Sequence, residues 1–241
     1  MDIIISCEPL NGGSLAVVDK WGTDQKIVDC ARVSYDRGER EQTRSTEDML
    51  KQLYALGHHT PFEQCGMTFK VKTPLFVWRQ WIRHRIASVN EVSERYSESD
   101  LDFYEPDNWR VPAGTPLEIE EEIRTKQREI HEQIKNFYRY LREQKVPREL
   151  ARIDLPLSKF TTAYWSANLR EIFHFLKLRL DPAAQLEIRK YAEGMLFQVQ
   201  YFYPLAVKAF LSEEGELAKR YLCTIDFEAL PPELRGSHVT N

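Results

Sequence analysis

The residues best suited to chemistry lie close together in the stretch WRQWIRHRIASVNEVSERYSE, residues 78–98. Four arginines surround His84 in this stretch: Arg79, Arg83, Arg85 and Arg95. A guanidinium group binds a carboxylate or a phosphate through two parallel hydrogen bonds. The stretch therefore predicts an anion-binding site in a chain whose net charge is −4. The competing interpretation is a solvated helix end whose arginines pair with glutamates.

The spacing within the stretch indicates how one ligand would be reached. On a helix beginning near Pro74, Arg79 and Arg83 lie one turn apart, whereas Arg83 and Arg85 cannot share a face. The helix must therefore end or bend between Arg83 and Arg85 if both serve the same ligand. In an extended segment after Asn90, three alternating side chains would point the same way: Glu91, Ser93 and Arg95. They would offer an acceptor, a hydroxyl and a guanidinium.

Common cofactor and metal motifs are absent from the sequence. There is no GxGxxG, no GxxxxGK[ST], no GxSxG, no HExxH, no CxxC and no EF-hand loop. Any phosphate-bearing ligand would then be held by arginines and helix ends. A metal enzyme built on His58, His59 and His84 remains an alternative, but these histidines lack a ligand spacing, and we expect no metal.

A nucleic-acid-binding module is the other alternative. It would use the arginine stretch with aromatic side chains that stack on bases, namely Trp78, Trp81 and Tyr96. The net charge of −4 opposes this interpretation, because such modules usually carry a basic excess. Helical spacing also makes Trp78 and Trp81 better candidates for the core or an interface. We expect no nucleic-acid partner.

Composition and cysteine usage bound the class of protein. The 241 residues are 42% hydrophobic, enough for one sizeable core, and no composition break divides residues 1–241. The four cysteines are scattered, which is typical of a reduced cytosolic protein. The acidic N-terminal stretch does not resemble a signal peptide, and no run approaches the ~20 apolar residues that cross a bilayer. We expect a cytoplasmic protein with no membrane partner.

Hydrophobic periodicity predicts an α+β fold. We expect a mainly helical single domain around a small, mostly antiparallel sheet. Strands are predicted at 2–6, 14–20 and 66–74, with an extended piece before residue 167. Helices are predicted at 23–35, 45–57, 74–82, 168–180 and 183–204, with a short one near 146. A long amphipathic helix should place six residues on one face: Ile123, Ile130, Ile134, Phe137, Tyr138 and Leu141. We expect a long loop near 97–116 and a frayed tail at 230–241.

Several blocks together resemble the flavin-dependent thymidylate synthases. RHR at 83–85, followed after seven residues by Ser93 and then by Arg95-Tyr96, is similar to the signature of that family. Further similar blocks are GHHTPFEQ at 57–64, VPRELARIDLPL at 146–157 and NLREIFHFLKLRLDPAAQLEIR at 168–189. They occur in family order over residues 25–205. The resemblance implies reductive methylation of dUMP to dTMP, with methylenetetrahydrofolate as carbon donor, NADPH as reductant and bound FAD. It also implies a homotetramer with sites shared between subunits.

The resemblance also implies which residues bind each ligand. It assigns ten residues to FAD: His58, Thr60, Arg83, His84, Arg85, Glu91, Asn168, Leu169, Arg170 and His174. His174 occupies a position where some members carry Asn and others His, and these present different donor patterns to a flavin edge. The resemblance assigns eleven residues to dUMP, some from each of two subunits: Gln80, Trp81, Ile82, Arg83, Glu91, Val92, Ser93, Glu94, Arg95, Arg152 and Arg179.

Two of these residues bear directly on the chemistry. Arg179 matches the arginine that activates the uracil ring, and a fixed guanidinium stabilises a developing anion without exchanging a proton. Ser93 is a possible nucleophile, but its sequence neighbours Val92 and Glu94 supply no partner base. We therefore expect Ser93 to donate a hydrogen bond to dUMP while the flavin carries the reducing equivalent.

Overall fold

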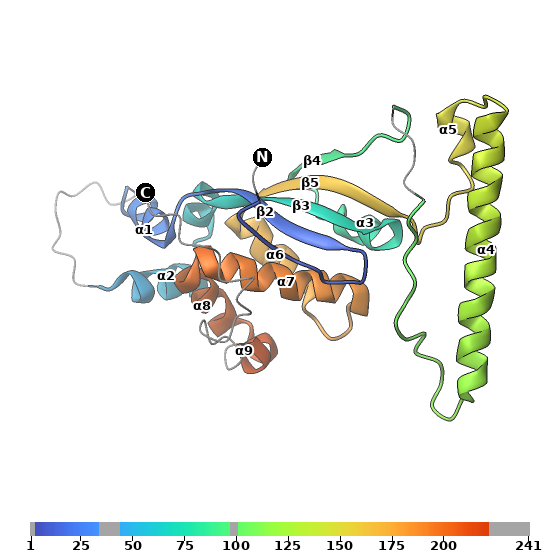
Figure 1. Ribbon diagram of the computed structural model, residues 1–241. Helices are drawn as coiled ribbons and strands as arrows, with labels where there is room; N and C mark the ends of the chain where they lie inside the picture. Colours follow the sequence, from blue (N-terminus) through green and yellow to red (C-terminus); the bar gives the residue numbers. More distant parts are fainter. Residues whose placement is uncertain (1–2, 34–43, 97–100, 222–241) are drawn as a thin grey trace.

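The computed structural model describes residues 3–33, 44–96 and 101–221. The predicted frayed tail at 230–241 lies outside these residues. A five-stranded sheet in the order β1-β2-β3-β5-β4 forms the centre of the fold (Figure 1). Its strands are β1 (Ile5–Cys7), β2 (Ser14–Trp21), β3 (Gly66–Pro74), β4 (Ser88–Glu91) and β5 (Phe160–Asn168). Every neighbouring pair is antiparallel, which confirms the predicted α+β class.

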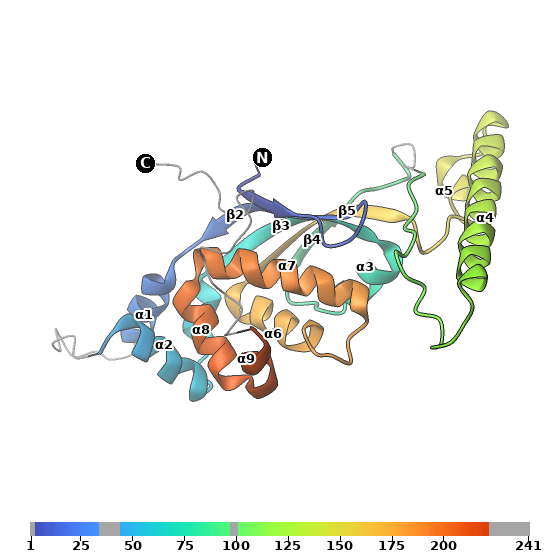
Figure 2. The same cartoon turned by 60° about the horizontal axis from the view of Figure 1, so that its bottom comes forward.

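Apart from α3 (Leu75–Trp81), the described helices fall into three groups around this sheet. Helices α6 (Leu169–Arg179) and α7 (Leu186–Phe202) cover one face of it (Figure 2). Four more helices lie at one end of the molecule or pack against α7: α1 (Asp24–Arg32), α2 (Thr46–Ala55), α8 (Pro204–Glu213) and α9 (Gly215–Tyr221). At the other end, α4 (Leu117–Glu143) and α5 (Arg148–Ala151) stand apart from the sheet (Figure 1). No described helix is long and apolar enough to cross a membrane.

Strand alternation supplies the core beneath α6 and α7. On β3, the apolar side chains Met67, Phe69 and Val71 are fully buried, while the intervening Lys70 is exposed. Trp165 on β5 packs at 5.8 Å from the ring of Phe175 on α6. The predicted helix starts at Thr23 and Ser45 are confirmed, because each side chain accepts a hydrogen bond from the first turn. Helices α8 and α9 were not predicted from the sequence.

The helix in the arginine stretch ends earlier than predicted. Helix α3 spans Leu75–Trp81, with Pro74 as its N-cap and not inside its first turn. Arg83 and Arg85 therefore both follow the helix, and the prediction that Arg79 and Arg83 share a helical face is wrong. The break lies before Arg83 because the chain must turn into β4 by Ser88.

The predicted extended wall after Asn90 is also only partly right. Strand β4 ends at Glu91, and the chain then turns, with the Tyr96 amide donating to the Ser93 carbonyl at 3.1 Å. Arg95 lies within this turn and its guanidinium stacks on Tyr96. The alternation of Glu91, Ser93 and Arg95 along a straight strand is therefore wrong, because strand pairing with β5 ends first.

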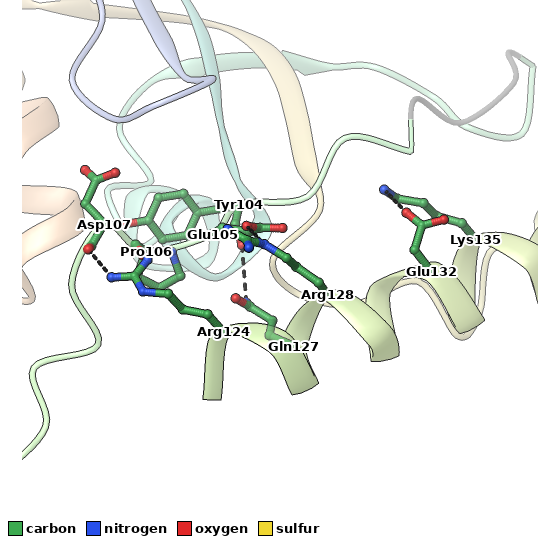
Figure 3. A network of polar contacts seen from close by, with 9 residues as sticks. All are labelled: Tyr104, Glu105, Pro106, Asp107, Arg124, Gln127, Arg128, Glu132 and Lys135. Carbon is green, nitrogen blue, oxygen red and sulfur yellow. Dashed lines mark hydrogen bonds and ion pairs between the residues drawn. The ribbon is translucent and has the colours of Figure 1, made fainter. Parts of the chain in front are cut away.

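Polar contacts join helix α4 to the loop before it (Figure 3). Arg124 donates to the Pro106 carbonyl at 2.9 Å, and Arg128 pairs with Glu105 at 3.0 Å. Tyr138 is buried as predicted, but Ile130 and Phe137 from the same apolar face are 54% and 46% exposed. The amphipathic helix is confirmed, and part of its apolar face stays exposed within the described part of the chain.

Candidate active site

Arg179 is the centre of the arrangement formed by α3 and α6. It is the last residue of α6, and its Nε donates to His84 Nε2 at 3.1 Å. Its Nη2 donates to the main-chain carbonyl of Gln80 at 3.0 Å. Burial lowers the pKa of the half-buried Arg179 guanidinium. Two contacts thus orient the group while Nη1 forms no hydrogen bond with the described residues. We call Gln80, His84 and Arg179 the α3–α6 corner.

His84 is neutral at physiological pH in this corner. Its pKa is lowered to about 4, chiefly by burial and secondarily by the charges of Arg179 and His174. Because Nε2 accepts the hydrogen bond from Arg179, the ring proton is assigned to Nδ1. That Nδ1 is buried and has no partner among the described residues. It is a fixed donor that a ligand acceptor could satisfy.

Helix α6 connects this corner to a second group of predicted flavin residues. Asn168 caps the helix by accepting from the Glu171 amide at 3.0 Å. Arg170 donates to Glu63 at 2.5 Å, and this ties α6 to the 3-10 turn Thr60–Gln64 that carries Thr60. His174 lies between the two ends of α6, with its ring 5.5 Å from that of His84. Helix α6 thus links the predicted flavin residues at its start, Asn168 and Arg170, to the corner that Arg179 forms at its end.

Three predicted residues differ in what they can offer. Leu169 and Trp81 are fully buried, so neither offers an exposed atom to a ligand in this structure. His58 is exposed after Gly57, a glycine with a positive φ of 72°. The neighbouring His59 is packed instead, since its ring stacks on that of Tyr54 with the ring centroids 4.7 Å apart.

The segment 88–96 carries five of the eleven predicted dUMP residues, and we call it the β4 segment. It forms an edge of the sheet, and five predicted residues on or beside it are largely exposed: Ile82, Arg83, Glu91, Val92 and Arg95. The Glu91 carboxylate is fixed, since it accepts from Trp78 Nε1 at 2.9 Å and from Thr161 Oγ1 at 2.6 Å. Glu94 forms an ion pair with Lys159. Ser93 and Glu94 are partly buried.

Arg152 does not lie beside the α3–α6 corner within the chain. It is the C-cap of α5, which packs on α4 at the end of the molecule away from α6 (Figure 1). The structure therefore divides the predicted residues into two sets. One set surrounds α6, and the other lies on the β4 segment and α5.

The residues present fit a flavin dinucleotide. Its phosphates require uncommitted cations, and its ring system presents several acceptor atoms. Arg83 and Arg85 are exposed and form no ion pair with any described residue, while His84 Nδ1 is an unpaired buried donor. Within the described residues, no cluster of histidine, cysteine, aspartate and glutamate suited to a metal ion occurs.

The residues that fix the predicted site residues through long-range contacts were not predicted from the sequence. Trp78 and Thr161 fix Glu91, Lys159 pairs with Glu94, and the Gln80 amide donates to Gln185 at 2.5 Å. The partners in these contacts are at least thirteen residues apart in the sequence, so no local pattern predicts the contacts. The run of hydroxyl side chains in KFTT, residues 159–162, was the one visible signal.

Comparison with known proteins gives one consistent family. The family model described as thymidylate synthase complementing protein matches residues 16–205. A flavin-dependent thymidylate synthase of Thermus thermophilus is 41% identical over 227 residues, covering 92% of this chain and 83% of that protein. The enzyme of the same name from Treponema denticola is 42% identical over 217 residues, covering 85% and 81%.

Solved structures agree with the sequence comparison. A UMP/dUMP methylase, PolB from Streptomyces cacaoi bound with 5-Br UMP, superposes with a TM-score of 0.75 at 31% identity. The match covers 83% of this chain and 94% of that one. The complex of the same protein with 5-Br dUMP gives a TM-score of 0.74 at 30% identity.

Proposed function

This chain belongs to the flavin-dependent thymidylate synthase family, and on that premise we propose that it methylates dUMP reductively to dTMP. Methylenetetrahydrofolate would be the carbon donor and NADPH the reductant. The observation that carries this proposal is Arg179, held by His84 and Gln80 in a half-buried corner. Such a guanidinium is suited to stabilise negative charge that develops on a uracil ring.

FAD would be bound along α6. Arg83 and Arg85 would hold its phosphates, and His84, Asn168 and His174 would meet its polar edges. Its chemistry when bound is hydride transfer. The protein residues bind and orient, and the buried His84 Nδ1–H supplies a hydrogen-bond donor that needs no reorganisation during the reaction.

The dUMP molecule would be bound by two sets of residues. Arg95 and Arg152 would bind the phosphate through paired hydrogen bonds, with Ser93 as a further donor. Gln80 and Arg179 would bind the uracil from the α3–α6 corner. The neighbour PolB is described as acting on both UMP and dUMP, so discrimination at the 2′ position is a property to be measured for this chain.

The two sets of residues would meet in a homotetramer. Support comes from the exposed β4 edge and from the part of the apolar face of α4 that the described residues leave exposed, namely Ile130 and Phe137. Arg152, on α5 beside α4, would then reach the corner of a neighbouring subunit. A cytoplasmic location also belongs to the proposal, supported by Cys7, Cys30 and Cys65, which are all free.

The direct test is the purified protein itself. We expect a yellow chromophore that is released on denaturation and identified as FAD. The protein should form dTMP from dUMP only when both methylenetetrahydrofolate and NADPH are present, and UMP should be assayed in parallel. A colourless protein that takes up no added FAD would refute the proposal.

A further inference from the structure

The turn that follows β4 rests on a buried lysine. The side chain of Lys159 is 3% exposed and pairs with Glu94, whose side chain is 17% exposed. The ammonium group also donates to the Phe160 carbonyl at 3.0 Å. A desolvated ion pair is sensitive to the loss of one partner, because the remaining charge is left buried without compensation.

Lys159 itself is held in place by its main chain. Its amide donates to the Pro156 carbonyl at 3.0 Å, and its carbonyl accepts from the Leu75 amide, the first residue of α3, at 2.9 Å. The same short stretch holds the β4 segment at two further points. Thr161 donates to Glu91 at 2.6 Å, and the Thr162 carbonyl accepts from the Val92 amide at 2.9 Å.

These contacts join one short stretch at the start of β5 to one substrate-binding segment. Thr161 and Thr162 hold Glu91 and Val92, where the segment still runs alongside β5. Lys159 holds Glu94, where the chain has left the strand and formed the turn that carries Ser93 and Arg95. Beyond β4 the strand pairing has ended, and there the Lys159–Glu94 ion pair connects the segment to the start of β5 instead.

We propose that Lys159 is a positioning residue that fixes the dUMP-binding turn, residues 93–96, through Glu94. This inference rests on the proposed function. Lys159 itself touches no substrate. It keeps the turn in its binding-competent arrangement before dUMP arrives, so that binding does not include the cost of ordering it.

The test compares two lysine variants of the assembled, FAD-loaded enzyme. Lys159→Met removes the buried ammonium group. Lys72→Met is the matched control, because Lys72 lies on β3 and pairs with Asp102 at 2.9 Å at a more exposed site. We expect Lys159→Met to raise KM for dUMP about tenfold, which corresponds to a turn that is competent about a tenth of the time. Its kcat and FAD content should stay within about twofold of the original, and Lys72→Met should change neither constant.

A double variant separates positioning from general damage. In Lys159→Met the Glu94 carboxylate loses its partner, whereas Lys159→Met with Glu94→Gln leaves no uncompensated charge. We expect the double variant to have a KM between those of the original enzyme and of Lys159→Met. Equal KM values for Lys159→Met and Lys72→Met would overturn the inference, as would a loss of FAD that parallels the rise in KM.

Amide hydrogen exchange tests the inference without turnover. Exchange of the Val92 and Tyr96 amides should quicken in Lys159→Met and not in Lys72→Met. If Lys159→Met does not fold, Glu94→Gln alone should produce the same change at Tyr96. An original enzyme that fails to methylate dUMP would refute the proposed function, while unchanged exchange at residues 92–96 would refute the positioning role of Lys159.

Discussion

The α3–α6 corner and the β4 segment carry the same kinds of side chain in opposite settings. In the corner, Arg179 is half-buried and its contacts come from its own chain, namely His84 and Gln80. On the β4 segment, Arg95 is exposed in the turn that follows the edge strand and stacks on an exposed Tyr96. Within the described residues, Arg179 is thus oriented by contacts of its own chain, whereas Arg95 is left exposed.

This contrast indicates how the work of the site is divided. An arginine that stabilises developing charge must be fixed before the reaction, so its own fold orients it. Cations and apolar groups left at an edge strand and along α4 are typical of a surface that another subunit covers. The contrast therefore predicts that each complete site combines the corner of one subunit with the β4 segment of another.

The largest effect should follow from Arg179→Met. Removal of a fixed donor to developing charge should lower kcat by about 10²–10³-fold, while FAD stays bound. Arg189→Met is the control, since the Arg189 guanidinium donates to the Pro182 carbonyl at 2.8 Å and makes none of the contacts to Gln80, His84 or Arg179. Steady-state kinetics with a visible spectrum of each variant would measure both quantities. Full activity in Arg179→Met would show that the buried corner is not the catalytic half of the site.

A complementation experiment tests the sharing itself. Arg179→Met and Arg95→Met should each be nearly inactive as pure proteins. After subunit exchange of a one-to-one mixture, about a quarter of the shared sites would combine an intact corner with an intact β4 segment, so activity should rise toward about a quarter of the original. Sites built within single chains would give no recovery. The measurement is dTMP formation before and after mixing.

A smaller effect is expected from a charge on the apolar face of α4. Phe137→Glu should raise the dissociation constant of the assembly by about tenfold or more, because an unpaired charge would have to be buried at the interface. Thr125→Glu adds the same charge at an exposed position on the opposite face of α4 and should leave the assembly intact. Light scattering over a dilution series measures both. A monomeric original protein with full activity would contradict the proposed tetramer.

The smallest effect concerns pH. Because the pKa of His84 falls from 6.5 to about 4 on folding, the unfolded chain takes up a proton below pH 6.5 that the folded chain resists. The free energy of unfolding should therefore fall as the pH drops from about 6.5 to about 4. His84→Gln should show a shallower fall over that window, measured by urea unfolding at each pH. Identical slopes would place His84 in a more solvated setting than the corner described above.

Local sequence patterns were sufficient for the class of fold and for the family. Alternation in residues 66–74 and the helix starts at Thr23 and Ser45 are local effects, and the structure confirms them. The blocks around RHR indicate the family because they are recognised by residue type and order alone, without the three-dimensional course of the chain between them. Local patterns could not show where α3 ends, since the break before Arg83 depends on β4 pairing with β5.

Long-range packing settles which side chains meet. Arg179 and His84 are 95 residues apart, and their contact follows from α6 packing beside the end of α3. Burial there makes His84 neutral and leaves its Nδ1–H without a hydrogen-bond partner among the described residues. Composition and spacing cannot predict either property. The apolar face of α4 was readable from its period, but its exposure was not, because burial depends on what surrounds a helix and not on the helix itself.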